Sequence, residues 1–165
     1  MNLTIRAGVV LGVLVVAWTF LMGVTGWYKD PVLSNLFWIV VLIQIAVLLW
    51  ALTKTAAVNG FARQVFSGTL ISMIASVPIF LGSLLFTTVA YPHYFEEVAA
   101  VQEEALRKSG RTAEEIRTAL ELAEEGATHM TQAIAGVVGT VLTGILASAM
   151  IAVFHRRRGG PEVLL

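Results

Sequence analysis

Cysteine is absent from this 165-residue chain, and charged residues are scarce. The absence of cysteine excludes disulfide bonds, thiolate metal sites and cysteine nucleophiles. Charged side chains make up 13 % of the sequence, about half of the ~25 % typical of soluble domains. Phosphate-binding loops, dinucleotide-binding fingerprints, EF-hand loops and nucleophile elbows are also missing, so no familiar enzyme class is indicated. Because the net charge is zero, the charge balance indicates no nucleic-acid partner.

Apolar residues dominate the sequence instead, at 57 % of the chain and with a mean hydropathy of +0.80. They form four runs, at about residues 5–27, 31–53, 65–90 and 130–154. Each run is long enough to cross roughly 30 Å of hydrocarbon as a helix. Apart from Arg6, the runs contain no Asp, Glu, Lys, Arg or His. We therefore predict an all-α membrane protein, a single four-span domain over residues 1–165 within a lipid bilayer.

Acidic residues gather between the third and fourth runs. Tyr91-Pro92 ends the third helix, because a residue before proline is pushed out of the α region, and Gly110 is the expected end of the next helix. Thr112 and Glu115 form a capping box that starts another helix. The pattern predicts an inserted acidic helical hairpin over residues 92–126. Residues 91–129 hold nine of the eleven acidic residues, namely Glu96, Glu97, Glu103, Glu104, Glu114, Glu115, Glu121, Glu124 and Glu125.

Basic residues close to the span ends predict the orientation. Arg6, Lys54 and Arg63 lie in short segments on one side, together with the Arg156-Arg157-Arg158 cluster. The other side has only Lys29 close to a span. The positive-inside rule therefore places both termini in the cytoplasm, including a tail at residues 156–165, and makes the hairpin extracytoplasmic.

Gln44 and Pro78 are the unusual residues within the spans. A proline inside a helix lacks an N–H and clashes with the carbonyl four residues earlier, so we expect a kink. Gln44, near mid-membrane, either hydrogen-bonds between helices or lines a small polar pathway with the kink. The lack of ionisable side chains in the spans disfavours proton-coupled transport.

Small residues repeat every four positions in the first and fourth spans. Lipid gives helices no hydrophobic reason to associate, so close backbone packing must supply the attraction. We predict that the fourth helix lies at the centre of the bundle, or alternatively forms the seam of a homo-oligomer. The residues concerned are Gly136, Thr140, Gly144 and Ser148 in the fourth span, and Gly8 and Gly12 in the first.

The two ends of the hairpin each carry a histidine. His93 and Glu97 share one helix face, as do Glu125 and His129, and an antiparallel hairpin would bring the two pairs together. Two imidazoles and two carboxylates can hold zinc tetrahedrally. The simpler interpretation is that these are interfacial histidines beside solvated glutamates, with no cofactor, and the sequence leaves both open.

Four motifs of the chain are typical of one membrane-protein family. They are Phe66-Ser67-Gly68, Tyr91-Pro92 with Phe95-Glu96-Glu97, Gly110 with residues 112–121, and the small-residue fourth span with its basic end. In these motifs the chain resembles a bacterial membrane family described as domain of unknown function 4199. The resemblance covers essentially the whole chain and implies four transmembrane helices, a bacterial source and hence the inner (cytoplasmic) membrane. It implies no activity, and His93 departs from the acidic or amide residue usual in the family.

These observations favour a non-enzymatic structural or interaction component of a membrane assembly. Its partner would be a second copy or another membrane protein, contacted through helix faces and the hairpin. An alternative is a small transporter or lipid-handling protein with a cavity beside Gln44, Pro78 and Gly82. A third is a metal-binding protein that uses the hairpin ends, the only cluster that could support an enzyme.

Overall fold

The computed structural model describes residues 2–55 and 59–158, with the backbone alone for Glu125 and residues 155–158. Most of the described residues are helical, and they include no strand. Four helical segments are long and apolar enough to cross a membrane: Leu3–Thr25, Leu33–Thr53, Phe61–Ala90 and His129–Phe154. The prediction of a four-helix, multi-pass membrane protein is confirmed. Of the tail predicted over residues 156–165, residues 156–158 continue α6, and residues 159–165 lie outside the described part of the chain.

The elements follow the predicted order with different boundaries. The first span is α1 (Leu3–Thr25), followed by a short 3₁₀ turn, η1 (Trp27–Lys29). The second combines the 3₁₀ helix η2 (Leu33–Trp38) with α2 (Ile39–Thr53). The third is α3 (Phe61–Leu85), which ends in a π-helical turn, η3 (Phe86–Ala90). Then come α4 (Tyr94–Lys108), α5 (Ala113–Gly126) and the fourth span, α6 (His129–Arg158).

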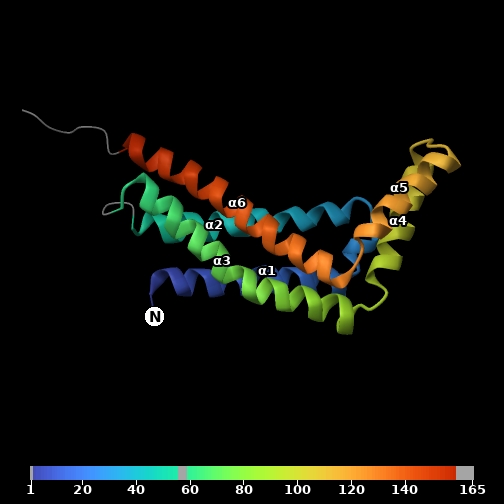
Figure 1. Ribbon diagram of the computed structural model, residues 1–165, viewed down its shortest axis with the longest axis horizontal. Coiled ribbons are helices and arrows are strands. Elements are labelled where there is room, and N and C mark those ends of the chain that lie inside the picture. The colour runs from blue at the N-terminus through green and yellow to red at the C-terminus, as the bar shows by residue number, and fades with distance from the viewer. Residues whose placement is uncertain (1, 56–58, 159–165) are drawn as a thin grey trace, which may run out of the picture.

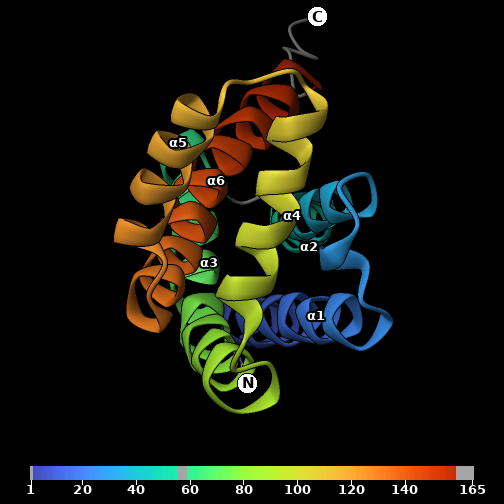
Figure 2. The same ribbon diagram turned by 90° about the vertical axis from the view of Figure 1, so that its right-hand side faces the viewer.

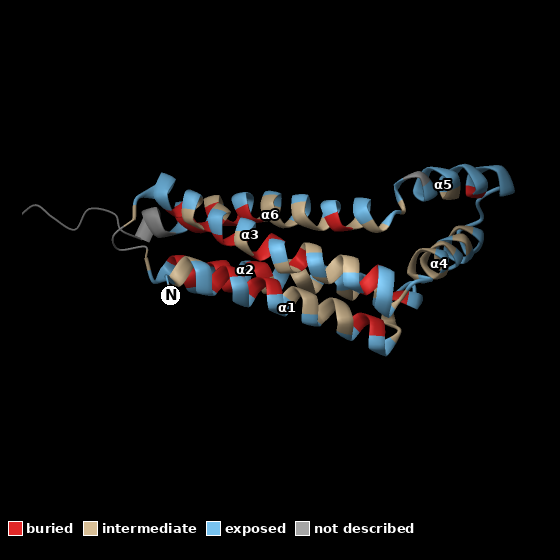
Figure 3. Cartoon of the chain, turned by 60° about the horizontal axis from the view of Figure 1, so that its bottom comes forward, coloured by how far each residue is buried: buried red, intermediate tan, exposed pale blue. Residues whose placement is uncertain are grey.

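The bundle is elongated, and its two ends differ. The start of α1 and the end of α6 lie at one end, and α4 and α5 project from the other (Figure 1). Figure 2 looks onto that second end, where α4 crosses in front of the membrane helices. α4 and α5 diverge from the short turn that joins them and together form an open V (Figure 3). The capping box of Thr112 and Glu115 is present, and Gly110 has a φ of 78°, so the predicted helix boundaries are confirmed there.

The interior position belongs to α3, which corrects the prediction that α6 would be central. α3 packs extensively against both α6 and α1. It can do so because small residues lie on two of its faces, Gly68 and Ser72 towards α6 and Ala75 towards α1. The buried apolar cluster is concentrated in the half of the bundle that contains the chain ends (Figure 3); its members include Ala7, Leu11, Leu48, Leu52, Ala75 and Ile151.

Glycines and serines interlock between α3 and α6. A Cβ on Gly68 would collide with the Ser148 hydroxyl, and a Cβ on Gly144 would collide with that of Ser72. The predicted small-residue row of α6 therefore packs inside the bundle at these positions, where Ser148 is fully buried.

The glycines of α1 bring it equally close to α3. A Cβ on Gly8 would lie 2.7 Å from the Ile74 Cβ, and one on Gly12 would collide with the Pro78 ring. α6 and α1 thus approach α3 closely on two sides. Their van der Waals contact with α3 holds the helices together in lipid, where hydrophobic burial provides no attraction between them.

The second span differs from the continuous helix expected over residues 31–53. Asp30 caps its start, with one carboxylate oxygen accepting from the Val32 and Leu33 N–H groups at 2.8 and 2.9 Å. The Asn35 amide then donates to the Pro31 carbonyl at 3.2 Å, a local bond that competes with regular helical bonding. The resulting η2 packs against α1, where the Trp18 indole donates to the Leu36 carbonyl at 3.1 Å.

The Gly–Ser packing predicts that Gly68→Ala and Gly144→Ala each destabilise the protein. The new methyl group must displace a serine on the facing helix, and overpacking of this kind costs ~1–3 kcal/mol. Thermal unfolding of the purified protein in detergent should show a lower midpoint for both variants.

The matched control is Gly139→Ala in the same helix, because nothing lies within 4 Å of a Cβ at that position. This variant should equal or exceed the wild-type midpoint, since alanine favours a helix by up to ~1 kcal/mol over glycine. Equal midpoints for all three variants would contradict the packing described above.

Candidate functional site

A cleft of about 310 Å³ lies among the four membrane helices. All four spans contribute to its walls, and most of the lining is apolar, for example Val15, Val41 and Ile79. Its inner end is at Gln44 and Thr143, and its outer end is at Phe37, Ser83 and Gln132, towards α4. Small-molecule sites in proteins occupy roughly 300–1,000 Å³ and combine apolar walls with a few polar groups. The cleft is therefore of ligand size and character.

A second hollow of about 200 Å³ continues the cleft towards α4. The two share Thr19, Phe37, Ser83 and Gln132, and the second extends to Tyr94 and Gln102 of α4. We call the combined space the apolar cleft. It runs from the Gln44 side chain in the middle of α2 to the base of the α4–α5 segment.

The lining of the apolar cleft is uncharged. It includes no Asp, Glu, Lys, Arg or His within the part of the chain that the structure describes. Some hydroxyl groups of the lining already donate hydrogen bonds to their own helix backbone: Thr19 donates to the Val15 carbonyl at 3.0 Å, and Thr87 donates to the Ser83 carbonyl at 3.0 Å. The site can thus bind an apolar body and offer hydrogen bonds, but it cannot neutralise a charge.

Gln44 forms the inner end of the apolar cleft and is only 4 % exposed. Its amide nitrogen donates to the Thr140 carbonyl of α6 at 2.6 Å and to the Ser72 hydroxyl of α3 at 3.3 Å. One side chain of α2 therefore connects three helices. The same residue also lines the cleft, which is apolar and not the small polar pathway considered from the sequence.

Of the other two residues of the predicted cavity, Gly82 lines the apolar cleft and Pro78 does not. Gly82 lines the apolar cleft opposite Val16, whose Cγ2 would lie 2.5 Å from a Cβ at position 82. Pro78 does not line it, because its ring packs on Gly12 of α1.

A polar link fastens α4 to the loop after α1, beside the mouth of the apolar cleft. The Tyr28 hydroxyl donates to one carboxylate oxygen of Glu97, and Lys29 Nζ donates to the other at 2.8 Å. Burial, together with the carboxylate it bonds, raises the pKa of Tyr28 to about 12. The hydrogen bonds from Lys29 and then Tyr28 lower the pKa of Glu97. We call these three residues the α4 link.

The aromatic rings around the α4 link hold several elements together. Tyr28 packs on Tyr91 and Tyr94, and Phe86 of the π-helical turn contacts the same two rings, with centroids 4.6–5.9 Å apart. The turn itself is closed by a hydrogen bond from the Tyr91 N–H to the Phe86 carbonyl at 2.7 Å. π-helical turns of this kind often occur at functional sites.

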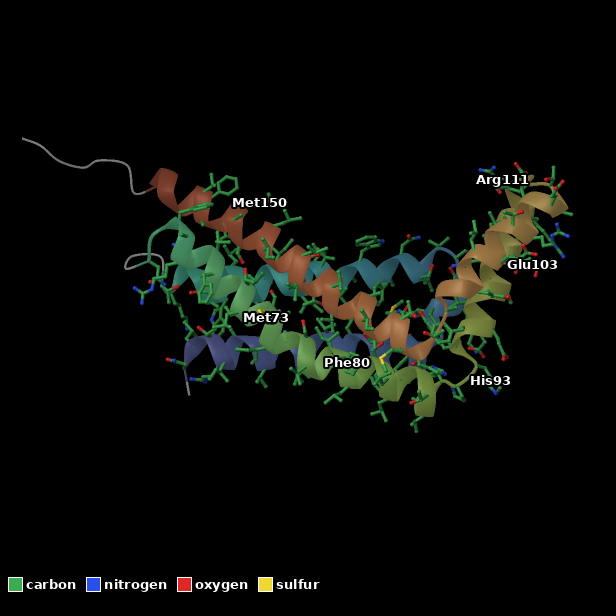
Figure 4. The ribbon with its side chains drawn as sticks, in the orientation of Figure 1. Met73, Phe80, His93, Glu103, Arg111 and Met150 are labelled. Carbon is green, nitrogen blue, oxygen red and sulfur yellow. The ribbon has the colours of Figure 1, made fainter. Side chains whose placement is uncertain are left out.

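The predicted zinc ligands are placed as follows. Glu97 belongs to the α4 link, and His93 points away from the bundle at the start of α4 (Figure 4), with its Nδ1 3.2 Å from Glu96 rather than Glu97. The His129 ring packs on Phe95 at 5.4 Å, and its Nδ1 is buried without a partner. Among the described residues, no group of three or more such side chains is spaced to hold a metal ion. The Glu125 side chain lies outside them, so the zinc site stays a prediction.

A comparison with known protein families gives a match over most of the chain. The family model described as "Protein of unknown function (DUF4199)" matches residues 6–157. The chain belongs to this family. The resemblance inferred from the sequence motifs is thereby confirmed over nearly the whole chain. No curated protein and no solved structure matches it.

Several residues of the site were not singled out from the sequence. Gln132 and Gln102 line the outer part of the apolar cleft, and Tyr28 and Lys29 form the α4 link with Glu97. For Gln132 a signal existed, since it is a strongly polar residue in the first turn of an otherwise apolar span. The partners of Glu97 are distant in sequence, and no local pattern indicates them.

The α4 link predicts a pH-dependent stability. The pKa of Glu97 in the folded protein lies below its ordinary value of 4.5. Its contribution to the free energy of unfolding is therefore complete above pH 4.5 and is lost as the pH falls below that value. Because the pKa of Tyr28 is raised from 10.0 to about 12, its contribution is complete below pH 10.0 and lost as the pH rises towards 12.

The measurement is the difference in thermal midpoint between wild type and Glu97→Gln, from about pH 3 to about pH 11. The wild-type advantage should be largest between the two limits and shrink at both extremes. Glu121→Gln is the control, because its exposed ion pair with Arg117, at 3.5 Å, contributes little. An advantage that is independent of pH would show that the α4 link does not act through these charges.

Proposed function

We propose that the protein is a non-enzymatic membrane protein that binds a small apolar molecule or lipid chain in the apolar cleft. The observation that carries the proposal is the cleft itself, which is uncharged, lined by all four spans and continuous from Gln44 to the base of α4. Membrane proteins packed only for structure need no opening of this size beside a hydrogen-bonding side chain. The lack of ionisable groups in the lining supports binding rather than catalysis.

The alternative, a component that works through helix contacts, has lost part of its support. Gly144 and Ser148 of the small-residue row are buried against α3 and do not form an outer seam. Ala135 and Gly139, small residues elsewhere on α6, line the apolar cleft. Association through the α4–α5 segment remains the second candidate, favoured by Leu122, which is 68 % exposed on α5.

We further propose that both termini are cytoplasmic and that the α4–α5 segment is an extracytoplasmic hairpin. The basic residues near spans, such as Arg6, Lys54 and Arg63, belong to the end of the bundle opposite α4 and α5 (Figure 1). Charge asymmetry of this kind places the basic end in the cytoplasm. With the family expected in bacteria, the membrane would be the inner one.

The natural absence of cysteine makes the orientation easy to test. Ser109→Cys, in the turn between α4 and α5, should react with a membrane-impermeant maleimide in intact bacterial cells. Arg63→Cys, at the opposite end, should react only after the cells are permeabilised. Labelling with the reverse pattern would place the α4–α5 segment in the cytoplasm.

The proposed function predicts saturable binding of an uncharged alkyl dye that becomes fluorescent in apolar surroundings. The full chain in detergent should bind about one dye per protein. Gly139→Phe should weaken binding about tenfold or more, because the ring enters the apolar cleft from a position where a Cβ meets nothing within 4 Å.

Leu142→Phe is the matched control, since Leu142 lies on the same helix, 56 % exposed and outside the cleft lining. It should bind the dye as wild type does. If wild type binds no dye saturably, or if Gly139→Phe binds it unchanged, the apolar cleft is not a binding site.

A further inference from the structure

We infer that the molecule in the apolar cleft is an uncharged, largely apolar compound with a hydroxyl group, which donates a hydrogen bond to the Gln44 amide oxygen. This inference rests on the proposed function, because it specifies the ligand of the same cleft. It is argued from the state of the Gln44 amide, from the hydroxyl groups beside it and from the lack of charge in the lining.

The Gln44 amide is fixed and only half used. Both hydrogens of its nitrogen are donated, to Thr140 on α6 and Ser72 on α3, which sets the plane of the amide. Over the described residues its oxygen accepts no hydrogen bond, and this oxygen is not one of the fully buried side-chain atoms that lack a partner, so it stays accessible from the cleft. An acceptor that faces an apolar cleft without a hydrogen-bond donor is costly. Since Gln44 lines the cleft, a ligand donor there would remove that cost.

Two further polar groups lie at the same end of the apolar cleft. Thr140 and Thr143 line it, and over the described part of the chain their hydroxyls form no hydrogen bond. They can donate as well as accept. A ligand group that both donates to Gln44 and accepts from a threonine suits this end best, and a hydroxyl group has that combination whereas an ether or a hydrocarbon lacks it.

The rest of the lining defines the remainder of the ligand. Beyond Gln44 the walls are apolar over Val40, Val41 and Phe37, so the ligand body should be hydrocarbon. A carboxylate, phosphate or ammonium would have to lose its hydration with no opposite charge in the lining, which is strongly unfavourable. A charged group is therefore excluded from the inner end of the apolar cleft by the same feature that admits a neutral hydroxyl group there.

The test compares three probes of equal chain length on the full chain in detergent: tetradecanol, its methyl ether and tetradecanoate. Each probe competes with the fluorescent alkyl dye, so one assay measures all three. Wild type should bind the alcohol about tenfold more tightly than the ether, the usual value of one hydrogen bond. Tetradecanoate at neutral pH should compete least.

Two matched variants locate the hydroxyl. Gln44→Met keeps the length of the side chain but removes the amide, and should bind alcohol and ether equally. Gln132→Met, at the outer end of the cleft, should keep the tenfold preference. Binding of the ether to Gln44→Met shows that this variant still forms the cleft, so the ratio remains interpretable.

The outcomes separate the two proposals. If the dye itself does not bind saturably, the proposed function fails; if the dye binds but no probe displaces it, the apolar cleft stands and the inference of an alcohol is overturned. If alcohol and ether bind wild type equally, the apolar cleft stands and the inference of a hydroxyl group is overturned. If Gln132→Met loses the preference and Gln44→Met keeps it, the hydroxyl lies at the outer end and the assignment to Gln44 is wrong.

Discussion

The close approach of α1 and α6 to α3 is the constraint on which the rest of the molecule depends. Within lipid the helices gain nothing from hydrophobic burial against one another, so contact between small residues must hold them. The Gly68–Ser148 and Gly144–Ser72 pairs provide it on one side of α3, and Gly8 and Gly12 provide it on the other. These contacts and the buried apolar cluster concentrate in one half of the bundle. The other half is looser, and the apolar cleft occupies it.

Gln44 marks the boundary between the two halves. Its bonds to Thr140 and Ser72 join α2 to the tightly packed pair of α3 and α6. Beyond Gln44, η2 packs along α1, and the hydrogen bond from the Trp18 indole to the Leu36 carbonyl joins the two helices. The π-helical turn and the α4 link then close the far end with a set of aromatic rings. Each boundary of the cleft is thus a specific interaction between elements distant in sequence.

Local rules were sufficient for much of the fold. Apolar runs without ionisable side chains predicted the four spans, and Thr112, Glu115 and Gly110 predicted where α4 ends and α5 begins. Hydrophobicity could not indicate that α3 rather than α6 is central, because every face of a membrane helix is apolar. Which helices come into contact depends on the complementary shapes of their surfaces. The 3₁₀ start of the second span depends on Asn35 and Asp30 bonding to nearby backbone, a competition that span-length arguments ignore.

The same division applies to the candidate site. Gln44 stood out as an isolated polar group in an apolar run, but its partners lie 28 and 96 residues away and required the fold. For the histidines, helical spacing failed: His93 lies beside Glu96, and the predicted shared face of Glu125 and His129 is wrong, because α5 ends at Gly126 and His129 begins α6, where it packs on Phe95. Spacing along one helix says nothing about which side chain on another element competes for a carboxylate, as Tyr28 and Lys29 do for Glu97.

The long sequence separation of these bonds also sets the order in which the molecule can be assembled. Lys29 lies 68 residues before Glu97, and Gln44 lies 96 residues before Thr140. A chain inserted from its N-terminus therefore has its first three helices in the bilayer before α4 can be fastened, and it lacks the inner end of the cleft until α6 has entered. Until that moment the Gln44 amide has no α6 carbonyl to bind within the hydrocarbon. Insertion of α6 is thus the step that gives the Gln44 amide nitrogen its partner on that helix and creates the space beside it.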